Sequence, residues 1–207
     1  SKYKGLDLHL LGYNFDWLNP ELLRILERLQ STREERNKKI IGKLQKIGIT
    51  ITEQDLKAES GAGVAGRPHF ARLLIKSGVV KNNQQAFSRY LKSGRCAYVP
   101  RFLLDIDDAI QILHGAGGIA VLAHPIQLNC SFSELSRLIK ELKELGLDGL
   151  ETYYPTQQGK AGKKIREFAE KYQLLETGGS DYHGTIRHGT SMAGGTRKFQ
   201  VPVELLN

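Results

Sequence analysis

Short apolar segments alternate with amphipathic helical segments in the second half of the chain, and this alternation restricts the folds that it can adopt. The segments at 118–125 and 149–155, and a third that ends at Ser180, have the length and composition of buried strands. Helical periodicity covers 133–145 and 160–172 between them. An order of strand, helix, strand, helix, strand predicts a parallel sheet with helical crossovers. We therefore predict an α/β fold for this half of the chain.

The first half is different, because helical patterns occupy nearly all of 19–115. They begin at an Asn-Pro pair, which is a typical helix start. One strand-like segment, 6–13, precedes them. The predicted organisation is a sheet domain built from 1–18 and 116–207, interrupted by an all-helical domain at 19–115.

The charge balance favours an anionic partner. Lys and Arg number 30 against 22 Asp and Glu, which gives a formal net charge of +8. The charged run at 33–39 is expected to be a solvated helix face, with nucleic-acid contact as the alternative. Cys96 and Cys130 are too few for a disulfide framework, so we expect a cytoplasmic protein. No apolar run approaches the roughly 18 residues that span a bilayer, so no membrane partner is expected.

Metal-binding side chains follow the predicted parallel strands. His124 comes directly after one strand, Glu151 or Tyr153 ends the next, and Asp181 and His183 follow the third. The carboxyl ends of parallel strands meet at one edge of a sheet, where ligands bind. Asp181 and His183 are two residues apart, so on an extended backbone they share a face and suit a divalent metal. The alternative for this Gly-rich segment is an ordinary surface turn.

Three further residues complete the candidates. His9 lies in the strand-like segment at 6–13, where it is either a metal ligand or a buried core residue. Arg67 and His69 flank Pro68, which is predicted to open a helix. Because a helix N-terminus attracts anions, these two side chains form either a phosphate clamp or a cap with surface charges.

The chain carries five motifs, in this order: Leu-His-Leu-Leu-Gly-Tyr at 8–13, Gly-Arg-Pro-His at 66–69, Tyr-Val-Pro at 98–100, Gly-Gly-Ile-Ala-Val-Leu-Ala-His-Pro at 117–125 and Gly-Ser-Asp-Tyr-His-Gly at 179–184. In combination they resemble the polymerase and histidinol phosphatase (PHP) family. Within it they resemble the bacterial branch of nucleoside 3′,5′-bisphosphate phosphatases and 5′-to-3′ exoribonucleases.

The resemblance implies a partial, distorted (β/α)7 barrel with an all-helical insertion domain. It implies a site for up to three divalent ions, with four ligands in this chain: His9, His124, Asp181 and His183. Asp181 and His183 would be the catalytic residues, and Arg67 and His69 resemble the insertion's contribution to binding the substrate phosphate. Oxygen and imidazole ligands suit Mn, Fe, Zn or Mg.

The family's first His-x-His strand and further ligands lie upstream of the strand that matches His9. We therefore expect that an N-terminal part is absent from this chain, or that a partner supplies those ligands. The resemblance then implies activity in the full-length parent and impaired activity in these 207 residues alone.

The function implied by the resemblance is hydrolysis of a nucleoside 3′,5′-bisphosphate, or of a short 5′-phosphorylated RNA, by a metal-activated water. One alternative keeps the fold and is a histidinol-phosphate-type phosphatase, which a substrate panel would separate. The other is a non-catalytic basic RNA-binding module, whose affinity would fall with salt and be indifferent to a chelator. The expected partner is thus a nucleotide or short RNA, and the sequence predicts no protein partner.

Overall fold

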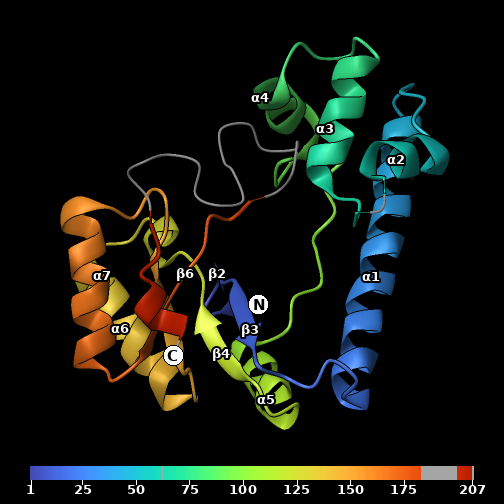
Figure 1. Cartoon of the computed structure of the whole chain (residues 1–207). Helices are drawn as coiled ribbons and strands as arrows, with labels where there is room; N and C mark the ends of the chain where they lie inside the picture. Colours follow the sequence, from blue (N-terminus) through green and yellow to red (C-terminus); the bar gives the residue numbers. More distant parts are fainter. Residues whose placement is uncertain (62, 183–199, 207) are drawn as a thin grey trace. The chain divides into compact units, whose positions relative to one another are not determined.

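The computed structural model describes residues 1–61, 63–182 and 200–206. The chain divides into two compact units, which we call the sheet unit (Ser1–Leu22 with Leu104–Asn207) and the helical unit (Leu23–Leu103). Figure 1 shows the elements of both. Among the described residues, none of the helices combines the length and the apolar character that a bilayer span requires.

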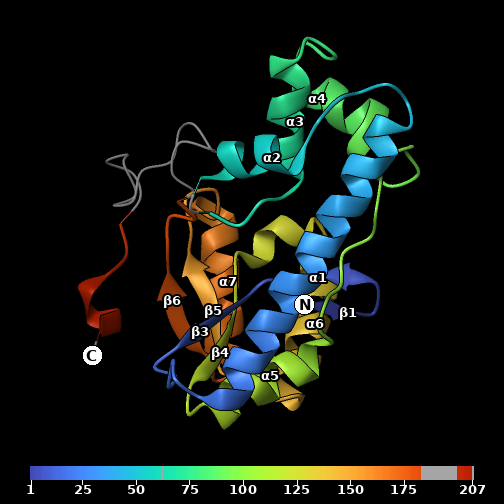
Figure 2. The same ribbon diagram turned by 90° about the vertical axis from the view of Figure 1, so that its right-hand side faces the viewer.

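The sheet unit contains four strands in the order β3, β4, β5, β6. The strand β4 (Ile119–Leu122) is parallel to β5 (Gly149–Tyr153), and β5 is parallel to β6 (Leu175–Gly178), as Figure 2 also shows. The strand β3 (Leu10–Tyr13) runs antiparallel to β4. The predicted α/β fold is confirmed, and the partial, distorted (β/α)7 barrel stays a prediction.

The strand-like segment at 6–13 is not one strand, and that prediction was wrong. The strand β2 (Leu6–Asp7) pairs with β1 (Lys2–Tyr3) in a separate two-stranded sheet. Leu8 and His9 lie between β2 and β3. The side chain of Leu8 is fully buried in the core, and its amide donates to Ser1 O. The segment therefore contributes to two different sheets.

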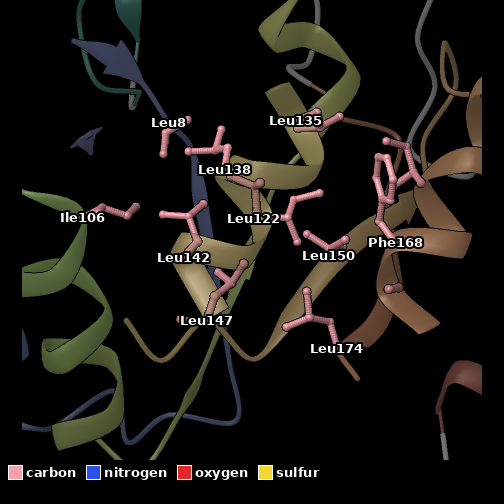
Figure 3. Packing of buried hydrophobic residues seen from close by; sticks show 14 of the residues in the cluster. Leu8, Ile106, Leu122, Leu135, Leu138, Leu142, Leu147, Leu150, Phe168 and Leu174 are labelled. Atoms are coloured by element: carbon pink, nitrogen blue, oxygen red, sulfur yellow. The ribbon is translucent and has the colours of Figure 1, made fainter. Parts of the chain in front are cut away.

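Helices cover the core face of the sheet. Alternate residues of the strands, Ala120 and Leu122 of β4 and Leu150 of β5, pack in one apolar cluster with side chains of α6 (Phe132–Glu144) and α7 (Gly159–Lys171). Figure 3 shows this packing around Leu122, Leu150 and Phe168. Such burial supplies the main stabilisation of the unit, at about 25 cal/mol for each Å² of apolar surface removed from water.

The helix α5 (Ile106–Gly115) belongs to this unit as well. Ile106 and Ile110 are buried in the same apolar cluster as Leu122. The sequence placed the end of the all-helical domain at 115, whereas the compact helical unit ends at Leu103. The difference arises because α5 is amphipathic, and a local helical pattern does not reveal which core its apolar face enters.

One carboxylate connects the starts of β4 and β5. Asp148 Oδ2 accepts one hydrogen bond from the amide of Ala120 and lies opposite His114 Nε2, both at 2.7 Å. His114 lies in the last turn of α5, so Asp148 joins three elements at the amino end of the parallel strands.

The helical unit consists of most of α1 (Pro20–Gln45), then α2 (Glu53–Ser60), α3 (Arg67–Lys76) and α4 (Asn83–Ala86), which continues into the π-helical turn η1 (Phe87–Leu91). Thr52 caps α2 in a reciprocal pair of bonds with Asp55. The unit has its own apolar core, to which α1, α2 and α3 all contribute. The predicted helical character of this region is confirmed.

Glu59 is the polar link between α2 and α3. Its side chain is 8% exposed and pairs with Arg72 and, at 2.6 Å, with Lys76 Nζ. These two cations hold the pKa of the Glu59 carboxyl below its ordinary value. The pair is therefore charged at neutral pH and fastens the two helices together.

We expect Glu59→Gln to destabilise the helical unit by about 1–2 kcal/mol at pH 7, because Arg72 loses a charged partner. Since the folded pKa is depressed, this stabilisation is complete above the unfolded pKa and is lost as the pH falls through the folded pKa. Hydrogen exchange of the α2 and α3 amides at pH 7 and pH 4 measures the difference. Glu53→Gln, at an exposed position of the same helix, is the control. An equal loss at both pH values would contradict the assignment.

Candidate active site

The carboxyl ends of the parallel strands carry the predicted chemistry. His124 follows β4 and precedes the short helix η2 (Pro125–Leu128), and Asp181 follows β6. Because β4, β5 and β6 are parallel, their carboxyl ends open on the same edge of the sheet. His183 lies outside the described residues, so its predicted role stays a prediction.

His9 and His124 are brought together from opposite parts of the sequence. His9 Nδ1 lies 3.2 Å from His124 Nε2, and the ring centroids are 5.0 Å apart. The amide of Ala123 donates to His9 O, which extends the β3–β4 pairing to the two histidines. His9 is exposed, so its alternative as a buried core residue is excluded.

His124 has an uncommon backbone conformation. Its φ is +31° and its ψ is +57°, in the left-handed region, and it directly precedes a proline. Glu151 Oε2 accepts the His124 amide at 2.7 Å. The Nδ1 atom of the His124 ring is buried and has no hydrogen-bond partner among the residues that the structure describes. A strained backbone and an unsatisfied buried nitrogen together are typical of a functional position.

Glu151, the third of the five residues of β5, is only 4% exposed. Burial raises the pKa of its carboxyl to about 7, and the nearby charge of Asp181 also raises it, while the hydrogen bond from the His124 amide lowers it. Gly179 leaves room for this carboxylate, since a Cβ atom there would lie 2.9 Å from Glu151 Oε1. The sequence placed Glu151 at this edge but gave it no role.

Asp181 is also held in the left-handed region, with φ +51°. Tyr154 donates its hydroxyl proton to Asp181 Oδ2 at 2.9 Å. The Tyr154 ring lies beside the His124 ring, with centroids 5.5 Å apart. Asp181, Glu151 and His124 are thus one connected group, and Tyr154 is a member that the sequence analysis missed. Its position directly after β5 was the available signal.

The donors present fit part of a metal centre. Two imidazoles and a carboxylate suit Mn, Fe or Zn, and the unsatisfied His124 Nδ1 shows that this ring is not fully used by the protein. Within 1–61, 63–182 and 200–206, no group of three or more His, Cys, Asp or Glu side chains is arranged to hold an ion.

The helical unit contains a separate concentration of positive charge. Arg67 and His69 lie in the first turn of α3, as predicted, and Arg67 stacks on Tyr98 with its guanidinium carbon 5.8 Å from the ring centroid. His69 is buried and its Nδ1 accepts the amide of Gly66 at 3.0 Å. Its Nε2 must then carry the proton, and this buried donor has no partner among the described residues.

Arg36 of α1 was expected on a solvated surface, but it is only 8% exposed. Burial lowers the pKa of its guanidinium to about 10, and repulsion from three neighbouring arginines, Arg33, Arg67 and Arg101, adds to the effect. Its Nε is buried without a partner among the described residues, and its Nη2 donates to Asn37 at 3.1 Å. A buried cation among like charges is costly, so the arrangement suits an anion.

The sequence of this chain is similar to those of several known phosphate-ester hydrolases. The chain is 36% identical over 183 residues to a 5′-3′ exoribonuclease of Haemophilus influenzae, a match that covers 88% of this chain and 66% of that protein. It is 29% identical over 177 residues to a 3′,5′-nucleoside bisphosphate phosphatase of Chromobacterium violaceum, covering 85% and 62%. It is 30% identical to a phosphoribosyl 1,2-cyclic phosphate 1,2-diphosphodiesterase of Eggerthella lenta, covering 87% and 68%. No protein-family model matches the chain.

Solved structures give the same result. A Bifidobacterium adolescentis protein described as a metal-dependent phosphoesterase superposes with a TM-score of 0.79 at 25% identity, covering all of this chain and 71% of that one. An amidohydrolase of Chromobacterium violaceum, solved with bound sulfate, has a TM-score of 0.75 at 28% identity, covering 92% and 68%.

The chain therefore belongs to the PHP family of phosphoesterases. Its relatives include the exoribonucleases and bisphosphate phosphatases of that family, which confirms the resemblance drawn from the motifs. The chain spans 62–66% of the length of these relatives.

Proposed function

We propose that the whole protein is a metal-dependent phosphoesterase that hydrolyses nucleoside 3′,5′-bisphosphates or short 5′-phosphorylated RNA. The observation that carries this proposal is the convergence of His9, His124 and Asp181 at the carboxyl ends of the strands, tied together by Tyr154 and Glu151. The names of the relatives, exoribonuclease and bisphosphate phosphatase, support the substrate class. The four-stranded sheet would be part of a distorted (β/α)7 barrel, and the helical unit would be its insertion.

Divalent ions would be held by His9, His124 and Asp181, together with the predicted ligand His183. When bound, such ions neutralise phosphate charge and lower the pKa of a coordinated water. The protein's own part is to keep these donors in fixed orientations, which the hydrogen bonds of Glu151 and Tyr154 do. The donors suit Mn, Fe, Zn or Mg.

The helical unit would bind a phosphate group that is not hydrolysed. Arg67, His69 and Arg36 offer two guanidinium groups and one imidazole N–H, and two of these three side chains are nine-tenths buried. Guanidinium groups bind phosphate oxygens through paired, charge-assisted hydrogen bonds. A second phosphate on the substrate would thus be required for tight binding.

The test is phosphate release from adenosine 3′,5′-bisphosphate with Mn²⁺, compared with adenosine 5′-monophosphate and histidinol phosphate. We expect the bisphosphate to be the best of the three substrates and EDTA to abolish its hydrolysis. Preference for histidinol phosphate would favour that phosphatase class instead. RNA binding that is indifferent to EDTA, without hydrolysis, would favour a binding module.

Arg36→Met is expected to raise the KM for adenosine 3′,5′-bisphosphate by about 10- to 100-fold, the value of one or two charged hydrogen bonds. The KM for the monophosphate should change much less. Steady-state kinetics with both nucleotides measure the ratio. Lys38→Met removes an exposed cation from the same helix and is the matched control. Equal effects of Arg36→Met on both substrates would refute a role in binding the second phosphate.

A further inference from the structure

Tyr154 is almost fully buried at the edge of the candidate site. It is only 2% exposed, although it lies directly after the last residue of β5. Its hydroxyl lies within hydrogen-bond distance of both Gln127 Nε2 and Asp181 Oδ2. Gln127 belongs to η2, three residues after His124. One tyrosine hydroxyl therefore connects the loop of His124 to the loop of Asp181.

The chemistry of the three groups fixes the direction of the protons. The Gln127 amide nitrogen is only a donor, so the tyrosine oxygen accepts from it. The single hydroxyl proton of Tyr154 is then directed to Asp181, whose ionised carboxylate is only an acceptor. A hydroxyl that accepts one bond also donates a stronger one, because successive hydrogen bonds polarise each other.

Asp181 needs such support. It lies outside regular secondary structure, and its left-handed backbone is uncommon for a residue with a side chain. Ladder hydrogen bonds of the sheet cannot orient its carboxylate. Tyr154 can, since its ring is buried and packs beside His124.

We infer that Tyr154 is a positioning residue that orients the Asp181 carboxylate relative to His124, and that Gln127 sets the direction of the Tyr154 proton. The inference rests on the proposed function, because it concerns how Asp181 is presented to a divalent ion. Residues that hydrogen-bond to metal ligands without touching the metal commonly contribute about 10- to 100-fold to metal affinity or activity.

The experiment measures Mn²⁺ binding to the whole protein by electron paramagnetic resonance of the free ion, together with kcat and KM. Tyr154→Phe retains the ring and removes the hydroxyl, and we expect Mn²⁺ affinity to fall about 10- to 100-fold. We also expect kcat to fall while the KM for substrate stays within about twofold, since uniform substrate binding is untouched. Tyr172→Phe is the matched control, because it also removes a hydrogen-bonded tyrosine hydroxyl, one that lies opposite Ser136 Oγ at 2.7 Å, and it should leave Mn²⁺ affinity as it is.

A second variant tests the direction of the proton. Gln127→Glu replaces a donor by a charged acceptor of the same length, so the Tyr154 hydroxyl would turn from Asp181 to the new carboxylate. We expect a loss of Mn²⁺ affinity similar to that of Tyr154→Phe, and a smaller loss in Gln127→Met. Wild-type Mn²⁺ affinity in both Tyr154→Phe and Gln127→Glu would overturn the inference while leaving the phosphoesterase proposal intact. A parent protein that neither binds Mn²⁺ nor releases phosphate would overturn both.

Discussion

Asp181→Asn is expected to lower phosphate release from adenosine 3′,5′-bisphosphate by more than about 100-fold. Residues that hydrogen-bond to metal ligands already contribute about 10- to 100-fold to metal affinity or activity, so a ligand itself should contribute more. Asparagine keeps the shape of the side chain and can still accept the Tyr154 hydroxyl, so the change removes mainly the negative charge. The measurement is kcat/KM for the whole protein at saturating Mn²⁺.

His124→Ala should cause a comparable loss, since its ring faces His9 at 3.2 Å and its second nitrogen is unsatisfied among the described residues. Asp108→Asn, at an exposed position of α5, is the control for a change of charge alone. Activity within tenfold of wild type in both Asp181→Asn and His124→Ala would show that these two residues do not form the active site.

Glu151→Gln is expected to stabilise the metal-free sheet unit at pH 8 by up to about 3 kcal/mol. Burial raises the pKa of Glu151 to about 7 from its ordinary 4.5, and each pKa unit corresponds to about 1.4 kcal/mol. A raised folded pKa means that the native state holds the proton more tightly than the unfolded state. The cost of the buried charge is therefore complete above pH 7, declines between pH 7 and 4.5, and is absent below.

Glutamine is neutral at every pH, and its carbonyl oxygen can still accept the His124 amide. Hydrogen exchange of the β5 amides in EDTA, at pH 8 and near pH 5, measures the free energy of opening. Glu144→Gln, at an exposed position of α6, should show no such dependence on pH. A Glu151→Gln variant less stable than wild type at pH 8 would show that the ionised carboxylate stabilises the native state.

The sequence predicts the local elements well and the long-range placement only in part. The parallel strands and their connecting helices follow from periodicity, and the positions of His124 and Asp181 follow from the rule for the ends of parallel strands. Arg36 was assigned to a solvated face because its neighbours along the chain are charged. Its burial depends on packing in the helical unit, which local patterns do not contain.

The proximity of His9 to His124 could not be predicted either, because it also depends on long-range packing. It requires the antiparallel pairing of β3 with β4, between segments more than 100 residues apart, and local periodicity carries no information on that partner. Tyr154 was missed for a different reason: an aromatic residue after a buried strand is ordinary core composition. Its hydrogen bonds to Gln127 and Asp181, which give it a role at the site, are visible only in the structure.

Asp148 matters for any attempt to build the His9, His124 and Asp181 site on another protein. By accepting the Ala120 amide and facing His114, this residue supports the alignment of β4 with β5. A slip of one position would turn Glu151 toward the helices and Leu150 toward the reactive edge. A designer who copies only the ligands onto another scaffold would leave out Asp148, which supports the strand alignment from the opposite end of the strands.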